Sequence, residues 1–155
     1  MGHEDFMRKA ISLAVENIKN GGGPFGAVVV KNGEVVATGV NRVTANNDPT
    51  AHAEVSAIRA ACTRLGTFDL SGCVLYTSCE PCPMCLGAIY WAHIDKIYYG
   101  ANQYDAAAVD FDDSFIYREL ELAPAERKKP MENIRHDDAL MPFNMWQSKD
   151  DKVKY

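Results

Sequence analysis

The chain has 155 residues, 47% of them hydrophobic and 24% charged, and its 21 acidic and 16 basic residues give a net charge of −5. This length and composition are typical of a single globular domain, residues 1–155, and exclude a disordered chain. No run of about 18 apolar residues occurs, and the basic residues are scattered, so we expect neither a membrane nor a nucleic acid as partner. The acidic N-terminal stretch does not resemble a signal peptide. We therefore expect a cytoplasmic protein whose five cysteines stay reduced.

The first part of the chain predicts a helix and a hairpin. Apolar residues from Phe6 to Ile18 recur at helical spacing, and the three glycines at 21–23 should end that helix. Residues 25–41 then predict two strands. They should turn at Asn32-Gly33, because both central positions of a tight hairpin turn require a positive φ.

The rest of the chain predicts alternating helices and strands before an irregular tail. The expected elements are helices over 48–66, 81–93 and 112–120, strands over 73–78 and 95–101, and a tail over 124–155. Asp48 or Thr50 is suited to cap the first of these helices. This order predicts an α/β domain of three layers, α/β/α, with helices on both faces of a mixed central sheet.

Two short motifs carry the residues with metal and acid–base chemistry. His52 and Glu54 are two apart, so they can share a site only at the mouth of a helix. Cys82 and Cys85 are three apart and share one face near the start of the next helix, where the helix dipole favours thiolates. We predict that His52, Cys82 and Cys85 bind Zn²⁺, one ion per chain, and that Glu54 moves protons at the open fourth position.

Two other uses of the cysteines compete with this prediction. Cys79 could complete a closed structural zinc site with the same three ligands, or Cys82 and Cys85 could form a redox pair. Both alternatives leave Glu54 without a role, and the redox pair also leaves His52 without one. The catalytic arrangement is therefore favoured.

The spacing of these motifs resembles a known family. His52-Ala53-Glu54 followed by Pro81-Cys82-Pro83-Met84-Cys85 matches the H-x-E and P-C-x-x-C pattern of zinc deaminases. The chain is identified as a member of the cytidine deaminase-like superfamily, whose members remove amino groups from bases, nucleosides or nucleotides. The resemblance implies the cytidine deaminase-like fold and a zinc-dependent hydrolytic reaction.

A closer resemblance is to the small bacterial guanine deaminases, through "GGPFGAVVV", "NDPTAHAEV", "YTSCEPCPMCLGAIYWA" and "FDDSFIY". It implies a purine base as substrate, conversion of guanine to xanthine and ammonia, and a homodimer. It also assigns further site residues: Asp113 as a second catalytic acid, Asn41 as an amide that binds the purine, Phe25 and Trp91 as aromatic walls, and Tyr155 as a C-terminal contact.

Other readings stay open at this stage. Asp113 could simply cap a helix, Asn41 could belong to a turn, and Phe25 and Trp91 could be core residues. Among functions, tRNA adenosine deamination and cytosine deamination use the same metal chemistry. A non-catalytic zinc-binding scaffold is a fourth possibility, against which the presence of Glu54 counts.

Overall fold

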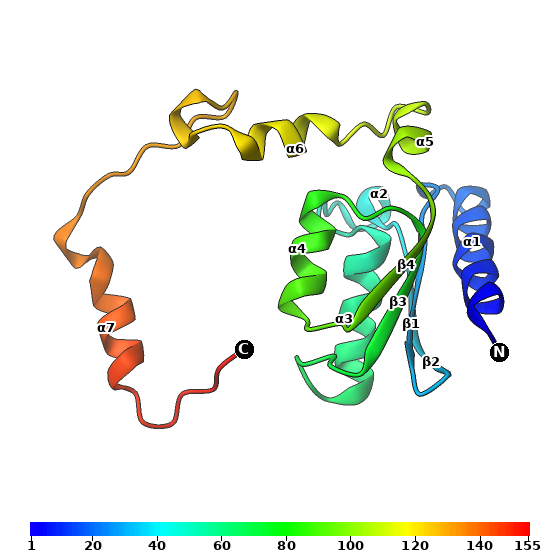
Figure 1. Ribbon diagram of the computed structural model, residues 1–155, viewed down its shortest axis with the longest axis horizontal. Helices are drawn as coiled ribbons and strands as arrows, with labels where there is room; N and C mark the ends of the chain where they lie inside the picture. Colours follow the sequence, from blue (N-terminus) through cyan, green and yellow to red (C-terminus); the bar gives the residue numbers. More distant parts are fainter. The chain divides into compact units, whose positions relative to one another are not determined.

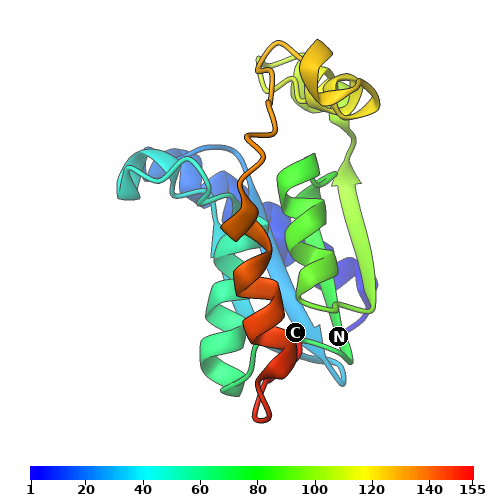
Figure 2. The same ribbon diagram turned by 90° about the vertical axis from the view of Figure 1, so that its left-hand side faces the viewer.

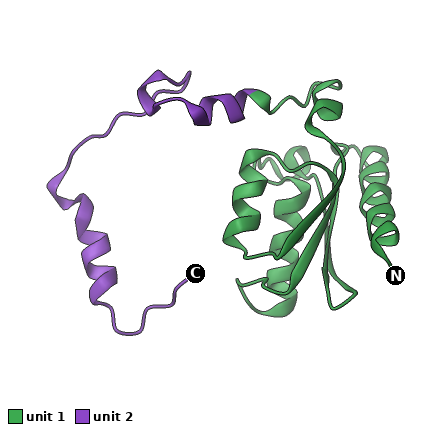
Figure 3. Cartoon of the chain, viewed as in Figure 1, with its two compact units in different colours: residues 1–114 green, residues 115–155 purple.

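The computed structural model describes all of residues 1–155 and divides the chain into two compact units, Met1–Ser114 and Phe115–Tyr155 (Figure 3). Each unit is described by itself. None of the helices is both long and apolar enough to cross a membrane.

The first unit is built on a four-stranded mixed sheet in the order β2-β1-β3-β4. The strands are β1 (Gly26–Lys31), β2 (Glu34–Val40), β3 (Cys73–Cys79) and β4 (Lys96–Ala101). β1 pairs antiparallel with β2 and β3, whereas β4 runs parallel to β3. The predicted hairpin joins β1 to β2, with positive φ at Asn32 (51°) and Gly33 (76°).

Helices cover both faces of this sheet, which confirms the expected three-layer α/β/α architecture. α1 (His3–Lys19) lies on one face, and α3 (Ala53–Leu65) and α4 (Pro83–Trp91) lie side by side on the other (Figures 1 and 2). Shorter helices connect these elements: α2 (Val43–Asn46), α5 (Gln103–Ala107) and α6 (Ser114–Glu121), which runs on into the second unit.

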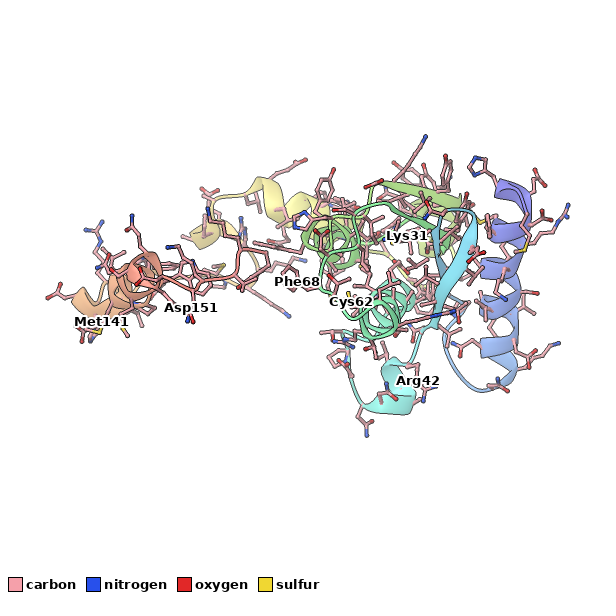
Figure 4. All side chains as sticks on the ribbon, turned by 90° about the horizontal axis from the view of Figure 1, so that it is seen from below. Lys31, Arg42, Cys62, Phe68, Met141 and Asp151 are labelled. Carbon is pink, nitrogen blue, oxygen red and sulfur yellow. The ribbon has the colours of Figure 1, made fainter.

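Burial on both faces of β1 explains its continuous apolar sequence. Ala27 and Val29 pack in a cluster with α3 and α4, whereas Val28 and Val30 pack in a second cluster beneath α1. A strand covered on both sides needs apolar residues at every position rather than at alternate ones. Cys62, labelled in Figure 4, packs against the first of these clusters.

The second unit has no buried residue in any of its helices. After α6 it holds two short 3₁₀ segments, η1 (Pro124–Glu126) and η2 (Asp137–Leu140), and α7 (Met141–Ser148). The second unit begins at Phe115, which is earlier than the tail expected from residue 124. It takes in most of α6, a helix that buries none of its side chains. That residues 1–155 act as one domain stays a prediction.

Candidate metal centre and active site

Two helix starts carry the three predicted metal ligands. His52 is the N-cap of α3, with φ −68° and ψ 161°, and Cys82 is the N-cap of α4, with φ −68° and ψ 168°. Cys85 follows in the first turn of α4, where Pro83 fits the fixed φ of the opening helical position. His52 and Cys82 thus each have an extended backbone and directly precede a helix.

The expected cap of α3 needs correction. Neither Asp48 nor Thr50 caps it, because Asp48 Oδ1 instead accepts hydrogen bonds from the backbone N–H and hydroxyl of Thr50, at 2.9 and 2.6 Å. This local turn precedes the helix and leaves His52 at the N-cap with its ring directed to the cysteines.

The three ligand atoms fit a zinc ion. The ligand atoms of His52, Cys82 and Cys85 lie within 4.8 Å of one another, and His52 Nδ1 is 3.5 Å from Cys82 Sγ and 3.4 Å from Cys85 Sγ. Bonds of about 2.05 Å to nitrogen and about 2.3 Å to sulfur at a tetrahedral angle place these atoms about 3.6 Å apart. The donor types and spacing therefore suit tetrahedral zinc with one position left for another ligand.

Cys79 is not part of this group of ligands. Its thiol faces the carbonyl oxygen of Asn102 at 3.7 Å, and burial raises its pKa to about 11. Only His52, Cys82 and Cys85 form the cluster, so the closed four-ligand alternative is not supported.

The electrostatics of the two cysteines also favour a cation. A hydrogen bond from Cys85 lowers the pKa of Cys82 to about 4, with a smaller contribution from His52. The same interaction, together with burial, raises the pKa of Cys85. Ionising both of these neighbouring buried thiols requires a positive charge beside them, which a divalent metal ion supplies.

Glu54 lies beside this centre in the first turn of α3. It is 6% exposed, and desolvation by burial raises its pKa above that of an ordinary glutamate. A raised pKa makes a carboxylate a better proton acceptor, and the group can return the proton at a later step.

A cavity of about 430 Å³ opens in front of the metal ligands, entirely within the first unit. Six predicted site residues line it: His52, Cys82, Glu54, Asp113, Asn41 and Phe25. The size is within the range of small-molecule sites, about 300–1,000 Å³. Cys85 is fully buried behind it.

Asp113 lines this cavity, and one of its carboxylate oxygens has no protein partner. Its Oδ1 is buried and accepts no hydrogen bond, and burial raises the pKa of the group. The capping role falls to its neighbour, since Asp112 Oδ1 accepts the backbone N–H of Ser114 at 2.8 Å. A buried carboxylate oxygen without a partner is costly to keep, which favours a role with a ligand.

Asn41 and Phe25 also line the cavity. The side-chain oxygen of Asn41 accepts the backbone N–H of Val43 at 3.1 Å, so its amide N–H groups are the donors offered to a ligand. Phe25 packs edge-to-face against Phe111, with ring centroids 5.0 Å apart. Phe111 also lines the cavity, and it was missed although it begins the recognised "FDDSFIY" segment.

Two predicted residues are not brought to the cavity by the first unit. Trp91 is 67% exposed and is the last residue of α4, whereas the metal ligands stand at the beginning of that helix. A nine-residue helix spans about 13 Å, so Trp91 does not line the cavity of its own chain, and its role as an aromatic wall stays a prediction. Tyr155 belongs to the second unit, and its role stays a prediction.

Further residues of the cavity were not recognised in the sequence. Glu80 Oε1 accepts the backbone N–H of Gln103 at 3.1 Å, and both residues line the cavity. This bond ties the segment before α4 to the start of α5. The only signal was the position of Glu80 beside the metal-binding cysteines.

A three-layer α/β/α fold that brings one histidine, two cysteines and a buried glutamate together at two helix starts defines a zinc-dependent deaminase. In agreement, residues 1–101 match the model of the cytidine and deoxycytidylate deaminase zinc-binding region, and the chain belongs to this family. The expected fold, family and zinc cofactor are therefore confirmed.

Comparison with individual relatives shows which members of the family this chain resembles over its full length. The chain is 53% identical to a guanine deaminase of Bacillus subtilis over 100% of both sequences. A solved structure of guanine deaminase from Bacillus subtilis superposes with a TM-score of 0.98 at 52% identity, covering 100% of this chain and 99% of that one. A tRNA-specific adenosine deaminase of Aquifex aeolicus is 44% identical, but over 65% of this chain and 67% of its own length.

Proposed function

We propose that this protein is a zinc-dependent aminohydrolase that converts guanine and water into xanthine and ammonia. The observation that carries the proposal is the 53% identity to a guanine deaminase along the whole chain. The shared family module ends at residue 101, and the cavity wall formed by Phe111, Asp112 and Asp113 comes after it. The residues that complete the pocket are therefore part of the full-length similarity.

The cavity has the groups that a purine base requires. Phe25 and Phe111 supply aromatic surface for the flat ring system. The Asn41 amide donates to an acceptor on the edge of the base, and the unpartnered Asp113 carboxyl faces an amino group. This places carbon C2 of guanine near Glu54 and the metal ligands.

The residues of the chain then carry out a hydrolysis in which the two protons of the water reach the base one after the other. His52, Cys82 and Cys85 would hold a zinc ion, which would lower the pKa of a bound water molecule to about 7. Glu54 accepts the proton of the attacking water and passes it to ring nitrogen N3, which makes C2 electrophilic. A C–O bond forms at C2. The remaining proton, on the hydroxyl group at C2, passes through Asp113 or Glu54 to the exocyclic nitrogen, the C–N bond breaks, and ammonia leaves a carbonyl at C2.

The charge of the cavity argues against a tRNA substrate. Five carboxylate residues and no lysine or arginine line it: Glu54, Glu80, Asp110, Asp112 and Asp113. Proteins that bind nucleic acids place basic groups against the phosphates. A phosphate next to a flipped-out base would be repelled here, so we propose that the substrate is a free base and that no nucleic acid is a partner.

We also propose a homodimer in the cytoplasm. Support for a partner subunit comes from large apolar side chains that the chain itself leaves exposed, among them Tyr90 and Trp91 on α4 and Phe143 and Met145 on α7. Support for a reducing compartment comes from the five cysteines, all of which are free thiols.

Ammonia release from guanine, cytosine, adenine, cytidine, guanosine and tRNA, each offered separately to the zinc-loaded protein, tests the proposed function. We expect rapid release from guanine alone. Release from cytosine or from tRNA in place of guanine would reassign the pocket. Binding of one zinc per chain without release from any of them would support a scaffold.

A further inference from the structure

One wall of the substrate cavity is built from two separate segments of the chain. Gly23 and Phe25 belong to the connection between α1 and β1, whereas Asn41 and Val43 follow β2, and all four residues line the cavity. The position of the Asn41 amide thus depends on how these two segments are held together.

Asn17 joins the two segments from outside the cavity. It lies on α1, is 8% exposed and does not line the cavity. Its Nδ2 donates to the carbonyl oxygen of Gly23 at 2.8 Å and to that of Asn41 at 2.9 Å. Both hydrogens of one amide group are thereby used, one on each segment.

Further hydrogen bonds continue this connection to the groups that face the substrate. The backbone N–H of Asn41 donates to the carbonyl oxygen of Phe25 at 3.2 Å, and the backbone N–H of Val43 donates to Asn41 Oδ1 at 3.1 Å. Asn17 therefore fixes the backbone from which the Asn41 amide projects.

Packing alone does not account for an asparagine at this position. The other buried residues of α1 are Phe6, Ala10 and Ala14, and an amide in such an apolar stripe costs free energy unless it is hydrogen-bonded. The nearby chain is also shaped around Asn17: a Cβ added at Gly22 would lie 2.8 Å from Asn17 Cγ.

We infer that Asn17 is a positioning residue for substrate binding, which acts through Asn41 and sets the wall that receives the purine. The inference rests on the proposed function. Asn41 contacts the base in the ground state and in the transition state alike, so a displaced Asn41 weakens binding without slowing the chemical step.

The test compares steady-state guanine deamination by the zinc-loaded wild type, Asn17→Ala, Asn41→Ala and the double variant. Asn17→Ala should raise KM by roughly three- to tenfold, which corresponds to one lost positioning hydrogen bond, with kcat changed by less than about twofold. In the Asn41→Ala background the same substitution should change KM by less than about twofold, because coupled residues are not additive. Equal increases of KM in both backgrounds, or an unchanged KM in Asn17→Ala, would overturn the inference.

Two controls separate positioning from stability. Phe6→Leu loosens the same helix where it packs on Tyr76, so it should lower the melting temperature and leave KM unchanged. If Asn17→Ala does not fold, Gly22→Ala provides a second variant, which displaces the Asn17 amide by contact. Its matched control is Gly2→Ala, where an added Cβ meets nothing within 4 Å. A raised KM in Gly22→Ala but not in Gly2→Ala supports the inference, and equal KM values contradict it.

An incorrect substrate assignment gives a result that differs from an incorrect role for Asn17. A wild-type protein that releases no ammonia from guanine refutes the substrate assignment. The role of Asn17 is then decided by the same KM comparison on whichever base the wild type does turn over.

Discussion

Glu54 is both a buried residue and the proposed proton carrier of the site. Its carboxyl is almost fully buried beside the metal ligands yet is not one of them. Glu54→Gln preserves the shape of the side chain and removes its ability to carry a proton. We expect one zinc per chain in this variant, measured by atomic absorption, and a kcat reduced by about 10²-fold to 10⁴-fold or more. A metal-free Glu54→Gln protein would assign Glu54 to metal binding instead.

The proposed role of Asp113 as a proton donor depends on pH. Burial raises the pKa of Asp113, so its proton is retained at pH values where an ordinary aspartate has lost it. As a proton donor to the leaving amine, Asp113 contributes most below its raised pKa and least above it. The ratio of kcat for wild type to kcat for Asp113→Asn should therefore fall as the pH rises from acid to neutral.

Measuring this ratio rather than the absolute rate cancels effects of pH on the rest of the site. Asp112→Asn serves as the matched control, because Asp112 binds the backbone N–H of Ser114 through its Oδ1. A ratio for Asp113→Asn that stays constant with pH would show that Asp113 binds substrate without donating a proton.

At the scale of elements, the close contact between β2 and α3 sets the position of His52. Gly39 lies in β2, and a Cβ added there would come within 2.9 Å of Ala57 Cα and nearer still to the backbone at Ala53 and Ala57. Gly39→Ala should therefore lower the free energy of unfolding by about 1–3 kcal/mol through overpacking. It should also weaken zinc binding, because pushing α3 outwards moves the N-cap ligand.

Urea denaturation and competition with a chromophoric chelator measure these two effects. Gly87→Ala on α4 is the matched control, since an added Cβ there meets nothing within 4 Å. Zinc affinity equal in both variants would mean that α3 shifts without disturbing His52.

The positions of the site residues within their helices and segments explain which of them the sequence could predict. His52, Cys82 and Cys85 could be placed because each stands at a helix start, which local patterns identify. Phe111 could not, since its place in the cavity depends on packing against Phe25 from a distant segment. Trp91 follows the metal-binding motif in the sequence, but it stands at the opposite end of α4 from the metal ligands.

At the scale of the whole molecule, the second unit, residues 115–155, is the part that the sequence predicts least well. The helix expected over 112–120 is found as α6, but the helices of this unit bury no side chain, so packing within the chain does not show what their apolar residues contact. Large apolar residues such as Ile134 (86% exposed) and Phe143 (70% exposed) have no core of their own. Burial of such residues on a partner subunit is the reason to expect a dimer.

The predicted role of Tyr155 can be tested together with this dimer. Deletion of Tyr155 should raise KM for guanine and leave the zinc content unchanged. If the tail of one subunit serves the site of its partner, a mixture of the Tyr155 deletion with Glu54→Gln regains activity. In such a mixed dimer, the intact tail of the Glu54→Gln chain completes the functional Glu54 site of the other chain.

Activity should rise only after subunits exchange, which size-exclusion chromatography of differently tagged chains can follow. Mixed dimers that form without any gain in activity would place each tail on its own subunit, and a monomer at all concentrations would contradict the dimer itself.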